Sequence, residues 1–380
     1  MTPGPTSTVT TREVHVVVPA GIDDLASPSG GNRYDRRVVQ GLAATGWDVR
    51  ERAVPGGWPR PDTTARAGLA TALDAVPDGA VVLIDGLVAC GVPDVVVPAA
   101  RRLALVVLVH LPLGDETGAP PELAVREREV LAAAAAVIAT SPWAAHRVVT
   151  RYGLDSARVT VATPGVDPAP LAPGTVESDL ADSDLAETGL LCVGALTPTK
   201  GQDLLVAALA EVRDLPWTAT LVGPLRDPGH VDAVRAAIER HGLAGRVRLT
   251  GPLTGAALDA AYAGTDLLVV PSRAETYGMV VTEALARGIP VLVSDAGGLP
   301  ETLGRDPEGR VPGMVVPAGR VADLGAALHG WMADPDRRAG LRRSAQRRGG
   351  MLHGWEVTSR CVATVLIGTA ELARTGGAPA

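Results

Sequence analysis

The segment PSRAETYGMVVTEALARGIPVLVSDAGGLPE, residues Pro271–Glu301, carries the strongest structural signal in the chain. It follows the short apolar run Leu267–Val270, which has the length and composition of a buried strand, and its middle part, Met279–Ala286, is typical of a helix. Ligands of open α/β sheets bind outside the carboxyl ends of the strands. The segment therefore predicts a strand, a ligand-binding loop that contains Glu275, and a helix that contains Glu283.

The start of this predicted helix has the features of an anion-binding site. Its first backbone N–H groups have no partners inside the helix, and they carry the positive end of the helix dipole. Glu283 is placed to accept hydrogen bonds from a ribose diol, and Glu275 to face a sugar. A pair of solvated helix-cap acids is the alternative for the two glutamates alone. The N–H groups expected to face a phosphate or sugar hydroxyls belong to Tyr277, Gly278, Met279 and Val280.

The composition is that of a globular protein of two domains. The chain has 380 residues, too many for one ordinary core, and is 46% hydrophobic, too apolar for disorder. A net charge of −7 argues against nucleic acid as a partner, because no basic excess is available to release phosphate counterions. The three cysteines lie far apart, and we find neither a signal peptide nor an apolar span of roughly 18 residues. We therefore expect a cytoplasmic protein whose membrane association is at most peripheral.

Short β-branched runs alternate with helical stretches in both halves of the chain, which predicts parallel sheets covered by helices on both faces. The expected parts are a disordered N-terminus (1–12), a first domain (13–170), a linker (171–188), a second domain (189–354) and a final helix that packs back towards the first domain (355–375). The predicted strands are Val14–Pro19, Asp48–Ala53, Val81–Ile84, Leu103–His110, Ala136–Thr140, Val159–Ala162, Leu190–Val193, Thr218–Val222, Arg246–Leu249, Leu267–Val270 and Val291–Val293.

Lys200 is the only lysine in a chain with 35 Lys and Arg residues. This bias is typical of a GC-rich bacterial genome, in which Arg replaces Lys wherever only the charge matters. A retained lysine indicates a need for the compact ammonium group. Gly194 begins the loop that leads to Lys200, and Gly201 follows it before the next helix, so the ammonium is expected at the sheet edge, where it can neutralise a phosphate. An ordinary surface lysine is the alternative.

These segments resemble the retaining glycosyltransferases of family four, whose EX7E signature is two glutamates separated by seven residues. The stretches LLCVGALTPTKGQDLL (Leu190–Leu205), ATSPWAAHRVVTRYG (Ala139–Gly153) and VTVATPGVD (Val159–Asp167) are similar to the same family. The resemblance covers most of residues 14–364. It implies the GT-B fold, an α/β architecture of two Rossmann-like, doubly wound domains that face an interdomain cleft. The N-terminal domain is then expected to bind the acceptor, and the C-terminal domain the nucleotide-sugar donor.

The resemblance also implies roles for single residues. Lys200 is expected to neutralise the donor's β-phosphate, and Glu275 to face the transferred sugar. His110 is expected in the cleft near that sugar, where an imidazole can bind a hydroxyl or assist the acceptor's proton. The implied donor contacts also include the glycine loop of Gly30 and Gly31 after the first strand, and the backbone near the base at Gly251 and Leu253.

One position departs from the family. Many members carry an arginine after the first glycine of the second domain, and this chain has Ala195 there. Either Arg273 replaces the missing cation, or donor binding relies more on helix dipoles.

Three other patterns predict no site. Asp182-Ser183-Asp184 spells a metal-binding DxD motif, but it lies in the acidic linker and does not follow a strand. The arginine pairs between Arg337 and Arg348 recur every five residues, which is typical of a solvated helix surface. No GxGxxG follows the first strand, which argues against a nicotinamide or flavin enzyme.

The resemblance thus implies a retaining, metal-independent glycosyltransferase, which we expect to need no cofactor. The donor is expected to be a UDP- or GDP-sugar, and the acceptor a hydroxyl group of a glycolipid, a glycoside or a secondary metabolite. Two alternatives stay open. One is a related activity of the same fold, a nucleotide-sugar epimerase or a sugar phosphorylase, and the other is a non-catalytic nucleotide-sugar-binding protein.

Overall fold

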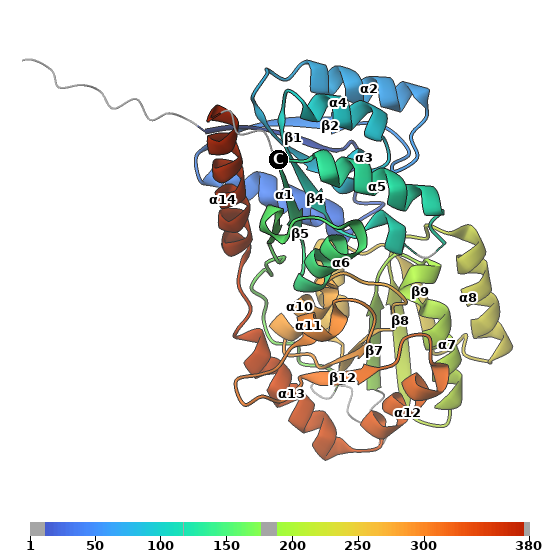
Figure 1. The fold of residues 1–380 in the computed structure, drawn as a ribbon. Coiled ribbons are helices and arrows are strands. Elements are labelled where there is room, and N and C mark those ends of the chain that lie inside the picture. The colour runs from blue at the N-terminus through green and yellow to red at the C-terminus, as the bar shows by residue number, and fades with distance from the viewer. Residues whose placement is uncertain (1–11, 117, 176–187, 376–380) are drawn as a thin grey trace, which may run out of the picture.

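The computed structural model describes residues 12–116, 118–175 and 188–375, and these form two parallel sheets of six strands each (Figure 1). The first sheet has the order β2-β1-β3-β4-β5-β6, and the second the order β12-β11-β10-β7-β8-β9. The strands of the first sheet are β1 (Arg12–Pro19), β2 (Trp47–Val54), β3 (Val81–Asp85), β4 (Ala104–Val109), β5 (Ala136–Ala139) and β6 (Val159–Val161). Those of the second are β7 (Thr188–Val193), β8 (Trp217–Val222), β9 (Val247–Gly251), β10 (Leu267–Val270), β11 (Val291–Ser294) and β12 (Gly313–Val316).

Helices cover both sheets, as the alternating sequence pattern predicts. Those that follow strands of the first sheet are α1 (Gly30–Ala44), α2 (Thr63–Asp74), α3 (Gly86–Ala89), α4 (Pro93–Ala100), α5 (Pro121–Ala133) and α6 (Pro142–Tyr152). Those that follow strands of the second are α7 (Gln202–Glu211), α8 (Pro228–Arg240), α9 (Gly255–Ala263), α10 (Met279–Ala286), α11 (Leu299–Leu303), α12 (Val321–Met332), α13 (Pro335–Gly349) and α14 (Trp355–Arg374). Single 3₁₀ turns occur at Leu113–Asp115, Ser156–Arg158 and Pro198–Lys200.

The strands read as continuous apolar runs because both faces of each sheet are buried. Strand β4, with the sequence ALVVLV, is buried at every position. Every predicted strand is present. The sequence pattern did not identify one strand, β12, an edge strand that begins with a glycine and has Val315 exposed.

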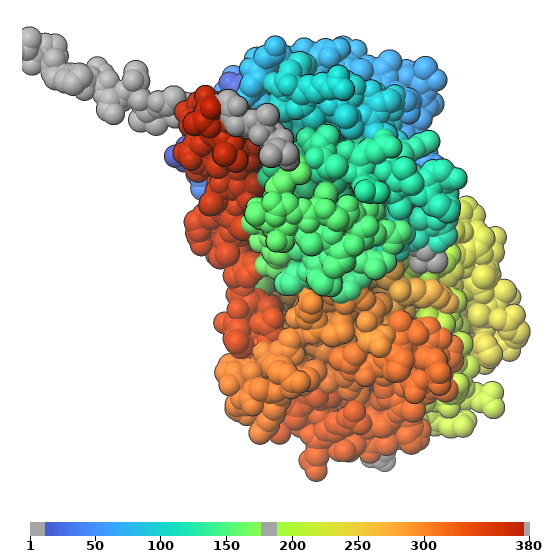
Figure 2. All heavy atoms as spheres, in the orientation of Figure 1, coloured from blue at the N-terminus to red at the C-terminus, as the bar shows by residue number. Residues whose placement is uncertain are grey.

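The last helix returns to the first domain. Figure 1 shows α14 beside α1, and Figure 2 shows its red atoms against the blue and green ones of that domain. A Cβ on Gly41 of α1 would lie 2.0 Å from the Ser359 hydroxyl of α14, so glycine permits the close approach of the two helices. Thr358 donates a hydrogen bond of 2.8 Å to the carbonyl of Thr163. The chain thus crosses between the domains twice, and Val166 N donates to His353 O (3.0 Å) where the two crossings meet.

The predicted linker lies mostly outside the described residues, as does the predicted disordered N-terminus, and Asp182-Ser183-Asp184 lies wholly outside them. The domain boundaries therefore stay predictions. Among the helices that the structure describes, none combines the length and the apolar character needed to cross a membrane.

Trp217 and Trp331 are the largest side chains in the core of the second domain, and Trp217 is fully buried. Its indole N–H donates to Val212 O (2.8 Å), and the Arg246 guanidinium lies 3.8 Å from the ring centroid. We expect Trp217→Ala to destabilise this domain by about 3–5 kcal/mol, because it leaves a large cavity. Urea unfolding measures the change. The matched control is Leu372→Ala at an exposed position, which should cost less than about 0.5 kcal/mol. Equal midpoints for the two variants would contradict the assignment of this core.

Candidate functional site

Lys200 and Glu275 meet at the carboxyl edge of the second sheet. The Lys200 ammonium donates a hydrogen bond to the Glu275 carboxylate. The two residues are 75 positions apart in the chain, but β7 and β10, which precede them, are neighbours in the sheet. Gly194 packs against the lysine stem, since a Cβ there would lie 3.5 Å from Cγ of Lys200. Gly201 has φ +71°, and a Cβ there would lie 2.3 Å from the carbonyl oxygen of Pro271, so only glycine lets the two loops approach this closely.

A second pair of glycines fixes the loop that carries Glu275. Gly298 N donates to Glu275 O (2.9 Å), and a Cβ on Gly297 would lie 1.9 Å from the same oxygen. Gly297 also has φ +58°, which favours glycine. The sequence analysis quoted this glycine pair without assigning it a role. The signal that would have found it is its position directly after β11, the neighbour of β10.

The amino end of α10 offers unpaired N–H groups, as the sequence analysis expected. Gly278 precedes the helix with φ +79°, and no side chain caps this end. The N–H groups of Gly278, Met279 and Val280 are therefore at the positive end of the helix dipole. The Tyr277 hydroxyl donates to Pro164 O (3.3 Å), and burial raises its pKa to about 12.

Glu283 is buried and has two side-chain partners. The Arg33 guanidinium donates to one of its oxygens, and the Tyr262 hydroxyl donates to the other (2.8 Å). Arg33 also pairs with Asp167 (2.8 Å), which binds Arg37 as well. Because Arg33 belongs to α1 of the first domain, this network joins the two domains. The sequence analysis did not find these partners of Glu283.

Arg273 is held in an ion pair, although one of the two expectations was that it is free to bind phosphate. Its guanidinium forms a two-pronged ion pair with Asp203 of α7, at 2.8 and 2.6 Å, and also donates to Pro198 O (2.7 Å). Burial raises the pKa of Asp203, but the hydrogen bonds from Arg273 outweigh this and lower it below its ordinary value. Of the two explanations for Ala195, this geometry favours the helix dipole.

His110 lies at the end of β4, where α1 of the same domain covers it. Its Nε2 is 2.8 Å from Oδ1 of Asp35, its ring packs edge-on against Tyr34, and a Cβ on Gly31 would lie 3.2 Å from the ring. Gly30, next along, faces Met279 of the second domain, with 3.6 Å between a Cβ and the sulfur. Gly30 and Gly31 at the start of α1 therefore lie close to His110 and to the start of α10, between the domains.

Asp85 completes a buried cluster with Asp35 and His110, and one ligand atom of each lies within 4.8 Å of the other two. Three ligand atoms at this spacing can hold a metal ion. Protons shared between the two carboxyl groups and the imidazole explain the same spacing without a metal. Burial raises the pKa of Asp85 to about 8. Burial lowers the pKa of His110, but the carboxylate of Asp35 reverses this and raises it to about 9. Burial therefore favours the protonated form of Asp85, and the neighbouring Asp35 carboxylate favours the protonated form of His110.

Gly251 and Leu253, the expected base contacts, lie at the same edge of the second sheet. Gly251 ends β9 with φ +73°, and its carbonyl accepts from Gly223 N (2.9 Å). Leu253 is half-buried and packs against the core of the domain.

The chain is thus an α/β protein of two Rossmann-like domains with the candidate site between them. Residues 182–348 match the family described as glycosyl transferases group 1. The match thus covers the C-terminal domain, and the whole chain has the GT-B fold, so the glycosyltransferase resemblance is confirmed at that level.

Two curated relatives are also named as glycosyltransferases. The chain is 35% identical over 276 residues to a D-inositol 3-phosphate glycosyltransferase of Salinispora tropica, and the match covers 68% of this chain and 55% of the relative. It is 31% identical over 256 residues to the protein of that name from Kribbella flavida, with 65% of this chain and 59% of the relative covered. The matches thus span little more than half of these relatives.

Solved structures share the fold at low identity. The sucrose-phosphate synthase of Thermosynechococcus elongatus superposes with a TM-score of 0.74 and 22% identity, over 96% of this chain and 98% of that one. Anabaena HepE in complex with UDP-glucose gives a TM-score of 0.73 and 19% identity, over 94% and 99% of the two chains.

The buried cluster predicts a pH-dependent stability. The folded-state pKa of His110, about 9, exceeds the ordinary value of 6.5, so its contribution is complete below about pH 6.5 and is lost as the pH rises through about 9. Asp85, with a folded-state pKa raised to about 8, loses its contribution in the same direction. We expect the unfolding free energy of the wild type, relative to His110→Gln, to fall by on the order of 1–3 kcal/mol between pH 6.5 and 9.5.

Urea titrations at four pH values test this dependence. His146→Gln at an exposed position is the control and should follow the wild type. A constant difference between the wild type and His110→Gln across this range would show that Asp35 does not hold the imidazole in its protonated form.

Proposed function

We propose that this chain transfers a sugar from a nucleotide-diphosphate sugar to a hydroxyl acceptor, with retention of anomeric configuration and without a metal ion. The observation that carries the proposal is the contact between Lys200 and Glu275 beside the uncapped amino end of α10. In this proposal the donor diphosphate takes the place of the Glu275 carboxylate on the ammonium. Glu275 then turns to the sugar.

The chemistry of the site supports electrostatic stabilisation of the leaving diphosphate. Negative charge grows on the β-phosphate as the glycosidic bond breaks, and a preformed ammonium and backbone N–H groups stabilise it without having to reorganise. Arg273 is held by Asp203, so its participation would first cost that ion pair. The proposed site therefore uses Lys200 and the N–H groups of Gly278, Met279 and Val280.

The protonation of His110 supports one of its two expected roles. A raised pKa of about 9 makes the imidazole a donor at neutral pH and a poor acceptor of protons. Because Nε2 is engaged by Asp35, Nδ1–H is the atom left to donate to a sugar hydroxyl. No side chain in this proposal acts as a covalent nucleophile, so the acceptor enters on the face that the diphosphate leaves.

Removal of the Lys200 or Glu275 side chain tests the proposal. We expect Lys200→Ala and Glu275→Ala each to lower kcat/KM by roughly 10²–10³-fold, the effect of losing one preorganised group at a developing charge. The control is Glu239→Ala, an exposed position on α8, which should match the wild type. Transfer at the wild-type rate by either site variant, at low and at saturating donor, would refute the assignment.

The absence of a metal requirement is a separate prediction. Transfer should continue unchanged after dialysis against EDTA, because the proposed diphosphate contacts are an ammonium and backbone N–H groups. Loss of activity that Mg²⁺ or Mn²⁺ restores would contradict it. Asp35→Asn would then test the cluster with Asp85 and His110 as the metal site.

Product analysis separates the remaining alternatives. An epimerase needs no acceptor, a phosphorylase needs inorganic phosphate, and a non-catalytic binder releases no nucleotide from the donor. NMR of the new glycosidic bond reports retention. The relatives named D-inositol 3-phosphate glycosyltransferase make that compound the first acceptor to assay, with UDP- and GDP-sugars as donors.

A further inference from the structure

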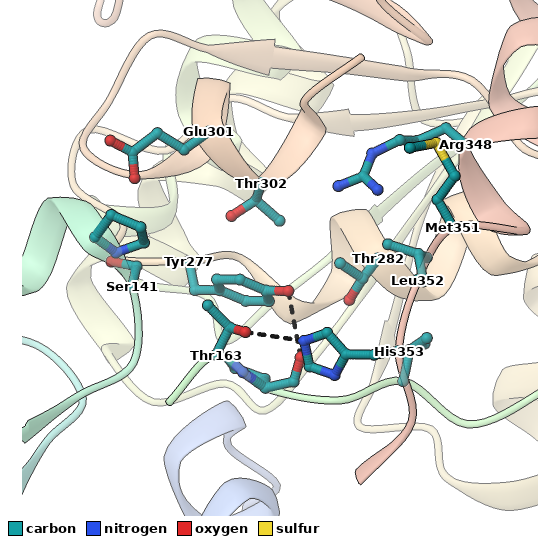
Figure 3. Close-up of a pocket in the computed structure, with 13 residues that line it drawn as sticks. Ser141, Thr163, Tyr277, Thr282, Glu301, Thr302, Arg348, Met351, Leu352 and His353 are labelled. Carbon is teal, nitrogen blue, oxygen red and sulfur yellow. Dashed lines mark hydrogen bonds between the residues drawn. The ribbon is translucent and has the colours of Figure 1, made fainter. Parts of the chain in front are cut away.

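A second pocket lies between the domains, and the donor site does not account for it. Its volume is about 230 Å³, and it is partly open to solvent. Both domains and the segment before α14 contribute to its wall, and of the residues expected in the donor site only Tyr277 lines it. The side chains that matter here are Ser141, Thr163, Tyr277, Thr302, Arg348 and His353 (Figure 3). We call it the interdomain pocket.

Arg348 brings a positive charge into this pocket. Figure 3 shows its guanidinium between Thr302 and Thr282, directed towards the space that Tyr277 faces. Arg348 Nε donates a long hydrogen bond to Leu303 O (3.3 Å). No carboxylate of the described residues lies within ion-pair distance of the Arg348 guanidinium, whereas one does for Arg347. The adjacent Arg347, in contrast, pairs with Asp306 at 2.7 Å. The expectation that these arginines form a solvated surface is therefore wrong for both residues.

Thr302 supplies an independent sign of a ligand. Its side chain is 4% exposed, and Oγ1 has no hydrogen-bond partner among the described residues. A buried hydroxyl without a partner is costly and uncommon in folded proteins. Thr302 lines the interdomain pocket, but its hydroxyl oxygen has almost no exposed surface, so a rotation of the side chain is needed to bring this oxygen to a molecule bound there.

The remaining wall favours an oxyanion that carries further hydroxyl groups. Tyr277 adds a phenol, and Thr163 and His353 are hydrogen-bonded to each other across the pocket wall at 2.9 Å. One carboxylate is present, that of Glu301. It is exposed at the rim and accepts a hydrogen bond from Trp143 N (3.0 Å), so solvent screens it.

We propose that the interdomain pocket binds a small phosphate ester, with the phosphate on Arg348 and Thr302. Guanidinium groups recognise phosphate through paired N–H donors, and a threonine hydroxyl adds a further one. The ligand contacts side chains of both domains, Ser141 on one side and Thr302 on the other, so its binding links their relative positions.

Phosphate titration of the full chain tests the proposal. The experiment uses Lys200→Ala as the background, so that the proposed donor site does not contribute, and follows inorganic phosphate and glucose 6-phosphate by isothermal titration calorimetry. Adding Arg348→Gln should weaken binding of both ligands by about tenfold or more, the loss expected for a charge-assisted hydrogen bond. The matched control is Arg343→Gln, an exposed arginine of the same helix, which should leave binding unchanged.

A second variant guards against a folding defect. Thr302→Val keeps the shape of the side chain and removes only the hydroxyl, so it should weaken phosphate binding by several-fold at an unchanged thermal midpoint. Absence of saturable binding in the Lys200→Ala background, or equal affinity with and without Arg348, would overturn the proposal. Because the background lacks Lys200, these results do not depend on whether the proposed transfer reaction is correct.

Discussion

The close approach of the loops that follow β7 and β10 is the constraint on which the candidate site depends. Gly201 and Gly297 leave room for the backbone oxygens of Pro271 and Glu275, and no larger residue fits at either position without moving a loop. This contact brings the ammonium of the only lysine in the sequence to Glu275. It also places the uncapped start of α10 beside that pair, so the same backbone packing sets both the charge and the dipole of the site.

The second domain is the part of the molecule that sequence reasoning describes best, and the reason is physical. Lys200 and Glu275 each follow a buried apolar strand, and parallel strands bring their carboxyl ends to one edge, so the sequence alone predicts that the two residues are near each other. The strands themselves are predictable because a sheet buried on both faces requires continuous apolar runs. The pattern does not identify the edge strand β12, which begins with a glycine and has an exposed valine among its four residues.

Contacts made by long side chains were not predictable in the same way. Arg33 binds Glu283, which is 250 residues away in the sequence. Arg273 binds Asp203, although one of the two expectations was that it is free to bind phosphate. Arginine has many rotamers, and its partner depends on which elements pack nearby, so composition and spacing carry no signal for it. Arg348 illustrates the same limit, since a periodic pattern of arginines does not distinguish an exposed helix face from the wall of a pocket.

The Arg33–Glu283 ion pair changes how a nucleotide reaches this protein. If Glu283 binds the ribose, its carboxylate must first release the guanidinium of Arg33, which lies in the first domain. Nucleotide binding then replaces the Arg33–Glu283 ion pair with a contact between Glu283 and the ribose. The Arg33–Glu283 ion pair then has to open before the nucleotide binds. The observed association rate should therefore level off at high ligand concentration, at the rate at which the ion pair opens. Added salt weakens the ion pair as well as the phosphate contacts, so the two effects oppose each other and the measured affinity should depend only weakly on ionic strength.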